Sequence, residues 1–394
     1  MRSISRARSS EAGTQVLIVA ASVRALAAAA RRAGYQPLAL DFFDDTDTRE
    51  ICSANGCAEG GLDHGFTWEN LIPALDALAG GAEPCGLVYG AGFEDRTSLL
   101  DCLARHWRLL GNRPESVRQV KDPVRLASLC ATLNIPHPET CTGFPPERAG
   151  WLAKRAGGSG GTHVAPAADI QAVSPAVYFQ RFVEGEPVSV QFLADGANIN
   201  VIGLTRQWTA PAPGEPHRFG GIMRPARVAP RLERQLRQAA ASVTAACGLR
   251  GLNSIDFLVM DRAYVLLEVN PRPGAALDIF EDDTGSSFRA HIDACCGHLP
   301  ARSFEFPDAA AAAIAYVPDG ICSFMPEFGW PDWAADRSKP GSPLRSHDPL
   351  CTIKAKAADP LEAHALAKAR ADLLLGRLAH IQDQNTGKRE EEIS

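Results

Sequence analysis

The chain has 394 residues, of which 45% are hydrophobic and 22% are charged, and its formal net charge is −6. This length exceeds one ordinary hydrophobic core, so we expect two or three domains in a globular protein. The negative charge gives no electrostatic reason to expect nucleic acid or a membrane surface as a partner. Eleven scattered cysteines without a C-x-x-C pair favour reduced thiols and a cytoplasmic location, and they do not indicate a zinc site.

The first 115 residues predict alternating strands and helices. Residues 14–22 ("TQVLIVAAS") and 35–45 ("YQPLALDFFDD") predict strands, and residues 23–34 predict a helix that ends at Gly34. A later strand is expected within residues 85–95 ("CGLVYGAGFED"), and this order predicts a parallel, Rossmann-like unit. The turn after the first strand, "AASVRA", lacks the G-x-G-x-x-G pattern of dinucleotide sites, so a nicotinamide or flavin enzyme is not expected.

Two further units are expected along the chain. Residues 116–300 alternate strand and loop signals around one helical insert, "PRLERQLRQAAASVTAACG", which predicts antiparallel α+β structure. Residues 301–384 predict a smaller α+β portion with a final helix, and residues 385–394 ("NTGKREEEIS") predict a disordered tail.

Residues 253–260 ("NSIDFLVM") and 264–270 ("YVLLEVN") predict a hairpin with a three-residue turn. The register that pairs Met260 with Tyr264 places Asp256 opposite Glu268, with Asn270 on the same face. The other face is apolar throughout and consists of Ile255, Phe257, Val259, Val265, Leu267 and Val269. Facing carboxylates repel unless a cation lies between them, and such oxygen donors suit Mg²⁺. A solvated sheet face with stray charges is the alternative explanation.

A glycine-rich run follows Lys154 in "WLAKRAGGSGGTHV". Such a run can fold backbone N–H groups around phosphate oxygens, although flexible linkers have the same composition. Its members are Gly157, Gly158, Ser159, Gly160 and Gly161. Lys121 and Lys154 are the only lysines before residue 339, and both stand beside predicted loops. Lysine offers a phosphate a compact point charge, so this placement favours a phosphate site.

Residues 180–186 ("QRFVEGE") predict the end of one strand, a turn and the start of the next strand. A short extended linker of this kind can read an adenine edge through its backbone, and a nearby carboxylate can bind ribose hydroxyls. Glu184 and Glu186 are both candidates for that carboxylate. The alternative is an ordinary hairpin with exposed acidic residues.

Taken in this order, Lys121, Lys154 with its glycine run, "QRFVEGE", Asp256 and "EVNPRPG" resemble the motifs of ATP-grasp enzymes. The resemblance covers roughly residues 115–300. The preceding unit resembles a pre-ATP-grasp domain, and the unit after residue 300 is similar to the C-terminal portion of biotin-carboxylase-related members. "GLVYGAGFED" and "LLGNRPESVRQVKDP" also look like the ATP-dependent carboligases predicted in this branch. The implied fold holds ATP between antiparallel sheets.

The resemblance also implies roles for individual residues. It assigns nucleotide binding to Lys121, Lys154, the glycine run, Gln180, Arg181, Phe182, Val183 and Glu186. It assigns Mg²⁺, as two ions for which Mn²⁺ can substitute, to Asp256, Glu268 and Asn270. Arg272 would contact the substrate or its acyl phosphate, and Arg272 and Lys154 are the expected catalytic residues. Many relatives have Glu-Lys where this chain has Gln180-Arg181, and Glu184 stays an alternative to Glu186 as the ribose ligand.

The implied chemistry is an ADP-forming ligation in the biosynthesis of a small molecule or cofactor. ATP would phosphorylate a substrate carboxylate, and an amine would then attack the acyl phosphate to give an amide. A tyramine–glutamate ligase-like role in a C1-carrier pathway is one specific case. A bicarbonate-phosphorylating enzyme and a non-catalytic nucleotide-binding scaffold are the alternatives. The expected partners are a small carboxylate and a small amine, and a homodimer is left open.

Residues 205–224 lie between the proposed adenine linker and the hairpin. Their arginines and Gly220-Gly221 are compatible with a lid or a substrate wall near the phosphates. A Pro/Gly-rich connection without a chemical role is the alternative.

Overall fold

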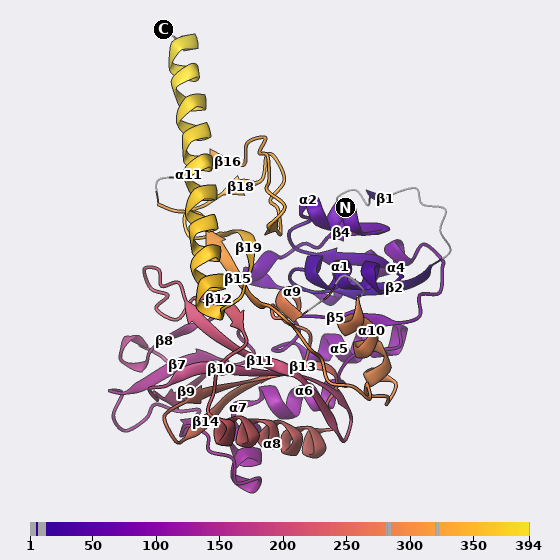
Figure 1. The fold of residues 1–394 in the computed structure, drawn as a ribbon, viewed down its shortest axis with the longest axis vertical. Coiled ribbons are helices and arrows are strands. Elements are labelled where there is room, and N and C mark those ends of the chain that lie inside the picture. The colour runs from indigo at the N-terminus through magenta and orange to yellow at the C-terminus, as the bar shows by residue number, and fades with distance from the viewer. Residues whose placement is uncertain are drawn as a thin grey trace.

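The computed structural model describes residues 5–6, 13–280, 282, 285–319, 321 and 323–393. Within these residues the chain has a mixed α/β fold with a five-stranded sheet, an eight-stranded sheet and two smaller sheets. The five-stranded sheet with its helices lies to one side of the eight-stranded sheet, as Figure 1 shows. The predicted combination of a parallel, Rossmann-like sheet with antiparallel sheets is confirmed.

The five-stranded sheet contains the N-terminal strands. They are β1 (Ser5–Arg6), β2 (Thr14–Val19), β3 (Tyr35–Asp41), β4 (Ala54–Cys57) and β5 (Leu87–Tyr89). The order is β1-β4-β3-β2-β5, and β2 to β5 are parallel. In β2, Val16 and Ile18 pack into one hydrophobic cluster, whereas Leu17 and Val19 pack into another. The continuous apolar run "VLIV" is therefore explained by burial on both faces.

Helices cover these sheets and join their strands. Their bounds are α1 (Arg24–Arg32), α2 (Thr46–Ile51), α3 (Gly61–His64), α4 (Trp68–Ala79), α5 (Thr97–His106), α6 (Pro114–Lys121), α7 (Pro123–Thr132), α8 (Pro230–Cys247), α9 (Leu277–Phe280), α10 (Ser286–Cys295) and α11 (Pro360–Ile393), with a short 3-10 helix at Ala167–Asp169. The side chain of Asp122 accepts hydrogen bonds from Val124 N and Arg125 N and thereby caps α7. Lys121 thus lies at the junction of α6 and α7.

The eight-stranded sheet is antiparallel throughout and runs in the order β14-β13-β10-β11-β12-β15-β19-β17. Its strands are β10 (Glu186–Asp195), β11 (Ile199–Thr209), β12 (Phe219–Arg224), β13 (Arg250–Val259), β14 (Tyr264–Asn270), β15 (Ala309–Tyr316), β17 (Ala334–Ala335) and β19 (Pro349–Ala357). Because β15 pairs with β12, this sheet continues across the predicted boundary at residue 300. That boundary and the one near residue 115 stay predictions.

The two smaller sheets complete the strand inventory. Their strands are β6 (Thr140–Cys141), β7 (Trp151–Arg155), β8 (Val164–Pro166) and β9 (Val177–Arg181) in one sheet, and β16 (Ser323–Phe324) with β18 (Pro343–Leu344) in the other. The sheet of β6 to β9 contains Lys154 on β7 and Gln180 on β9, in adjacent strands.

The two faces of the large sheet have different characters. One face packs against α8, which buries Leu232, Leu236, Ala240 and Val243 at helical spacing. Burying each large apolar side chain contributes about 1.5–3 kcal/mol. On β10 and β13, every second residue faces away from α8. These residues are Ser189, Gln191, Ser254 and Asp256, and they line a cavity. Strand alternation therefore places the polar residues on the cavity side.

The final helix, α11, packs its first half against β15 and β19 and then continues past the sheet (Figure 1). It ends at Ile393, so the structure has helix where the sequence predicts a disordered tail from residue 385. The segment contains the good helix formers Lys, Arg and Glu, which allow an existing helix to propagate. Within the described part of the chain, no helix combines the length and apolarity needed to cross a membrane.

Candidate active site

A cavity of about 610 Å³ lies where three parts of the chain meet. One wall comes from the glycine run and β7, a second from the polar face of β10 and β13, and a third from the loops that follow β2 and β5. The volume is in the range of small-molecule sites, which are about 300–1,000 Å³. The candidate site is therefore shared between the parallel and the antiparallel parts of the protein.

The hairpin of β13 and β14 has the predicted register at its polar end. Asp256 lies opposite Glu268, and Ser254 lies opposite Asn270. The register predicted at the turn is wrong, because an irregularity after Asp256 pairs Leu258 with Val265. A bulge of this kind reverses the facing of the residues beyond it. Consequently Leu266, not Leu267, is buried in the core, and Leu267 lines the cavity.

The predicted metal ligands form one hydrogen-bonded group. Lys121 Nζ donates to Glu268 and also to Asn270 Oδ1, at 2.9 Å. Asn270 Nδ2 donates to Asp256 Oδ2 at 3.0 Å, and Gln207 Nε2 donates to Asp256 Oδ1 at 3.1 Å. The ammonium of Lys121 thus lies between Glu268 and Asn270, and the assignment of Asp256, Glu268 and Asn270 to a metal stays a prediction.

The electrostatics of this group depend on which charges face each carboxyl. Burial and the neighbouring Glu268 raise the pKa of Asp256. Burial also acts to raise the pKa of Glu268, but Lys121, followed by Lys154 and Arg272, lowers it below its usual range. Glu268 is therefore ionised at neutral pH, and Asp256 is the carboxyl whose charged form a further cation would stabilise.

Lys154 projects from β7 into the same cavity. Its Nζ donates to Gln180 Oε1 at 2.7 Å, and burial lowers the pKa of the amine. Both lysines predicted to bind phosphate line this cavity. Gln180 belongs to the predicted adenine linker, yet its side chain is buried against Lys154 and does not line the cavity.

The glycine run lines the cavity with all five of its members. Gly160 and Gly161 have φ angles of 72° and 75°, which favour glycine. A Cβ on Gly161 would lie 1.9 Å from the carbonyl oxygen of His217, so the absence of a side chain permits this approach. Phe219 N donates to Gly160 O at 2.8 Å. The run is therefore packed against the segment of residues 205–224.

That segment forms a wall of the cavity. Its lining residues are Gln207, Trp208, Thr209, His217, Phe219 and Ile222. Its tip is anchored by Arg218, whose guanidinium stacks 3.7 Å from the ring centroid of Tyr316 and donates to Ala210 O at 2.8 Å. The segment therefore borders the cavity, and its role as a lid or substrate wall stays a prediction.

The predicted adenine and ribose residues, 180–184 and Glu186, all lie outside the cavity lining. Arg181 and Phe182 are exposed, and their backbone N–H groups donate to Glu139 O and Gly150 O. Glu186 is also exposed and forms an ion pair with Arg206. The nucleotide roles of residues 181–183 and Glu186 stay predictions.

Arg272 is held by a residue that the sequence did not identify. Its Nε donates to Glu94 Oε1 at 2.8 Å, and the other oxygen of Glu94 accepts from Gly92 N and Phe93 N. Burial acts to raise the pKa of Glu94, but Arg272 and Lys121 lower it to about 2. Glu94 follows β5, and the rule that ligands bind beyond the carboxyl ends of parallel strands was a usable signal for it.

Asn112 is a second residue that the sequence did not identify, and it fixes the loop that contains Arg272. Asn112 is 1% exposed, and its amide nitrogen donates to Asn253 Oδ1 at 2.7 Å and to Pro271 O at 2.8 Å. Its Oδ1 accepts from Arg250 N at 2.8 Å. These bonds join the end of the first unit to β13 and to the start of the Arg272 loop.

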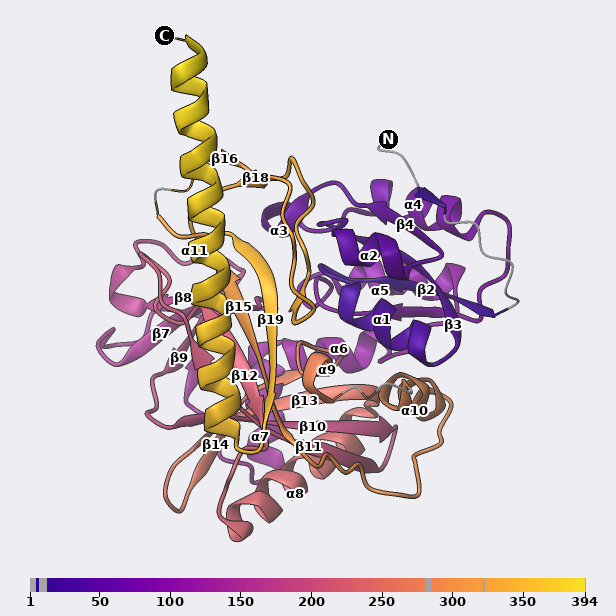
Figure 2. The same ribbon diagram turned by 45° about the horizontal axis from the view of Figure 1, so that its top comes forward.

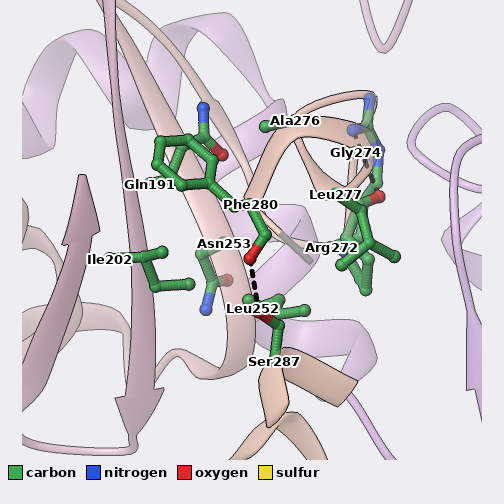
Figure 3. A pocket seen from close by; sticks show the side chains of 11 residues that line it. Gln191, Ile202, Leu252, Asn253, Arg272, Gly274, Ala276, Leu277, Phe280 and Ser287 are labelled. Atoms are coloured by element: carbon green, nitrogen blue, oxygen red, sulfur yellow. Dashed lines mark hydrogen bonds between the residues drawn. The ribbon is translucent and has the colours of Figure 1, made fainter. Parts of the chain in front are cut away.

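A small cavity of about 20 Å³ lies behind this loop (Figure 3). Gln191 and Asn253 present amide groups to it, and the loop residues Arg272 and Gly274 close one side. Ser287 Oγ, also in its lining, donates to Phe280 O at 2.9 Å. A space of this size accommodates one water molecule with polar partners.

Comparison with known proteins identifies related sequences and folds. Residues 125–276 match the ATP-grasp domain family. The fold is similar to a biotin carboxylase from Campylobacter jejuni, with a TM-score of 0.65, 16% identity, and 89% of each chain covered. It is also similar to N5-carboxyaminoimidazole ribonucleotide synthetase from Thermotoga maritima, with a TM-score of 0.63, 15% identity, and 92% of this chain and 98% of that chain covered.

A third similar structure is carboxyaminoimidazole ribonucleotide synthase from Aspergillus clavatus, which was solved in complex with ATP. Its TM-score is 0.65 at 13% identity, over 93% of this chain and 99% of that chain. At these identities the similarity establishes the fold alone. The substrates named for these proteins are not assigned to this chain.

Proposed function

From the match of residues 125–276 to the ATP-grasp domain family and from the similar fold, we propose that this chain is an ATP- and Mg²⁺-dependent ligase joining a carboxylate to an amine. The single observation that carries the proposal is the grouping of Asp256, Glu268 and Asn270 with Lys121 around one cavity. A protein that only bound a nucleotide would have less need of two carboxylates and an amide gathered in the same cavity as Arg272.

The donor set fits Mg²⁺. Two carboxylates and one amide oxygen are hard donors, and Lys121 already places one positive charge between Glu268 and Asn270. When bound there with ATP, Mg²⁺ would neutralise charge on the transferring phosphoryl group. Displacement of the Lys121 ammonium from Glu268 would then free it to contact a phosphate oxygen.

The remaining residues would bind the phosphate oxygens and orient the reacting groups. The glycine run offers backbone N–H groups to phosphate oxygens, and Lys154 adds a point charge from the adjacent strand. Arg272 is positioned by Glu94, so its guanidinium enters the reaction already oriented. Packing of residues 205–224 against the glycine run would exclude water from the acyl phosphate.

The overall reaction balances without a protein nucleophile. The carboxylate oxygen attacks the γ-phosphorus, and ADP leaves. The amine nitrogen then attacks the acyl carbon, the C–O bond to phosphate breaks, and a proton leaves the nitrogen. The products are an amide, ADP, phosphate and one proton. Glutamate with tyramine is the first substrate pair to test, in line with a role in cofactor biosynthesis.

The test is the identity of the released nucleotide. Purified protein should release ADP and phosphate only when ATP, Mg²⁺, a carboxylate and an amine are all supplied. Release of AMP and pyrophosphate would overturn the mechanism. ATP turnover with bicarbonate and no amine would instead select a carboxylating enzyme, and full biological activity of a Glu268→Ala chain would select a nucleotide-binding scaffold.

A further inference from the structure

One wall of the cavity is a row of three side chains across the small sheet of β7, β8 and β9. Lys154 on β7 lies directly opposite Val164 on β8 and Tyr178 on β9, and all three residues line the cavity. Residues that lie opposite each other in antiparallel strands share one face of the sheet. Figure 2 shows these strands together, beside the strands of the large sheet. Tyr178 is therefore the neighbour of a lysine that is proposed to bind phosphate.

The other face of this small sheet fixes the direction in which Tyr178 points. Phe179, the next residue on β9, is fully buried in a hydrophobic cluster with Trp151, Ala153 and Ala167. Successive strand residues point to opposite faces, so burial of Phe179 turns Tyr178 towards the cavity. The core behind the sheet thus holds the phenol at the cavity wall.

Within the described part of the chain, the hydroxyl of Tyr178 forms no hydrogen bond. Two other tyrosines behave differently: Tyr89 Oη donates to Asn112 O at 2.8 Å, and Tyr316 Oη donates to Phe219 O at 2.7 Å. A tyrosine hydroxyl that leaves bulk water usually has a partner. A hydroxyl that faces a cavity without a protein partner therefore indicates a contact with a ligand.

The donors on this wall favour an anionic ligand. Lys154 Nζ uses one of its three N–H groups for Gln180 Oε1 at 2.7 Å, so two N–H groups remain. Together with the Tyr178 hydroxyl, the wall offers three donors and one positive charge. A phosphoryl group presents several acceptor oxygens and a negative charge, and it matches this set of donors.

Glu268 does not compete for the hydroxyl. It accepts from Lys121 Nζ, and no hydrogen bond joins it to Tyr178 among the described residues. Burial, and then the charge of Glu268, raise the pKa of Tyr178, so the phenol keeps its proton at neutral pH and stays a donor. In the function proposed above Glu268 binds Mg²⁺, which leaves the hydroxyl to the ligand.

Resting on the nucleotide site of the proposed function, we propose that Tyr178 is a further nucleotide-binding residue. Its hydroxyl donates to an oxygen of the phosphate group that Lys154 contacts. As a neutral donor it adds a hydrogen bond to the phosphate chain without adding a charge to the wall.

The test measures binding to the full chain with Mg²⁺ and without carboxylate or amine. Calorimetric titration compares ATP with inorganic tripolyphosphate, which has the phosphates but neither base nor sugar. Tyr178→Phe should weaken binding of both ligands about tenfold, because a hydrogen bond to a charged group contributes about that factor.

Three results would overturn the proposal. Unchanged ATP binding by Tyr178→Phe would show that the hydroxyl contacts no part of the nucleotide. Weaker ATP binding with unchanged tripolyphosphate binding would assign the hydroxyl to the sugar or the base. Failure of tripolyphosphate to bind the wild type would show that this wall is not a phosphate site.

Two controls separate binding from folding. Tyr264→Phe is the matched variant, because Tyr264 packs on Phe257 with ring centroids 5.7 Å apart and does not line the cavity. It should leave binding of both ligands unchanged, and an equal loss in both variants would contradict the proposal. Without ligand, Tyr178→Phe should unfold at the same urea concentration as the wild type, since no protein hydrogen bond is lost. A lower midpoint would show that the hydroxyl bonds within the protein and would contradict the proposal.

The outcomes separate this inference from the proposed ligase activity. Tenfold weaker binding of ATP and tripolyphosphate by Tyr178→Phe, without amide formation from any carboxylate and amine, would keep this site and overturn the ligase. Amide formation with a KM for ATP that Tyr178→Phe leaves unchanged would keep the ligase and overturn this site.

Discussion

The two ends of the cavity use the same residue types in opposite ways. At the hairpin end, Asp256 and Glu268 lie on neighbouring strands, and one flexible lysine bridges part of the group. At the other end, Arg24 of α1 is enclosed by Asp278 and Asp336 through four hydrogen bonds. A lysine ammonium can leave when Mg²⁺ and phosphates arrive, whereas a guanidinium held in two forks is a structural cation.

Charge pairs that line one cavity can therefore contribute either to catalysis or to folding stability. The carboxylates of the hairpin group lie on two paired strands and line the cavity, so removing one of their charges should affect turnover more than folding. The Arg24 group joins α1, α9 and the region of β17, so its removal should affect folding first.

The largest expected effect is at the hairpin end. Glu268→Gln keeps the volume and can still accept from Lys121, but it removes one negative metal ligand. Turnover should fall about 10³-fold, because an electrostatic contact used in the transition state is lost. ADP release at saturating ATP and Mg²⁺ measures it, and urea unfolding should give a nearly unchanged free energy. If the variant lost folding stability but kept its turnover, the hairpin group would be structural and not catalytic.

The second effect is at the Arg24 end. Arg24→Met leaves Asp278 and Asp336, which are largely enclosed, without their cation, which should lower the free energy of unfolding by about 3 kcal/mol. Urea denaturation is the measurement. Arg31→Ala on the same helix is the matched control, since Arg31 is exposed and should change stability by less than about 0.5 kcal/mol. Equal effects of the two variants would show that the cluster is not structural.

The third effect concerns the buried side chain of His291, which is neutral at pH 7. His291 is fully buried; its Nδ1 accepts from Leu252 N at 2.8 Å, and its Nε2 lies 2.9 Å from Leu110 O. Burial lowers the pKa of His291 to about 4. An unfolded histidine titrates near 6.5, so protons bind the unfolded chain preferentially between these values.

The stability contributed by His291 is therefore present above about pH 6.5 and lost as the pH falls towards about 4, by roughly 3 kcal/mol. The measurement is the difference in unfolding free energy between wild type and His291→Gln at several pH values, which cancels the other titrating groups. The difference should shrink as the pH falls through this range. A constant difference would mean that the contact does not titrate.

The fourth effect sharpens the role of Glu94 as a positioning residue. Glu94→Gln should lower kcat about 10²-fold, because the orientation of Arg272 is lost, while KM for ATP changes little. Since the pKa of Glu94 is about 2, the ratio of wild-type to variant kcat should be the same at every pH above about 4. A change confined to KM would assign Glu94 to binding instead.

The smallest effect decides between Glu184 and Glu186. The residue that holds the ribose should, when changed to alanine, raise KM for ATP about tenfold and remove the preference for ATP over 2′-deoxy-ATP. The other alanine variant should leave both unchanged. If both variants kept the preference, neither carboxylate would bind the ribose. Glu186 is paired with Arg206 at the surface, so neither change should affect stability by more than about 1 kcal/mol.

Features that depend on neighbours along the chain could be predicted from the amino-acid order. The apolar run of β2 and the helix after it predicted the parallel unit, and alternation in "NSIDFLVM" and "YVLLEVN" placed Asp256 opposite Glu268. The scarcity of lysine directed attention to Lys121 and Lys154, which both line the cavity. Each of these inferences uses a short-range period or a composition contrast.

Features that depend on distant segments became visible only in the folded chain. The bulge after Asp256 turned Leu267 towards the cavity, and pairing of β15 with β12 carried one sheet across residue 300. Glu94 and Arg272 are hydrogen-bonded although they are 178 positions apart in the sequence. Arg24 and Asp336 are hydrogen-bonded although they are 312 positions apart. Such contacts leave no periodic trace in the sequence, because only the packing of whole elements brings these side chains together.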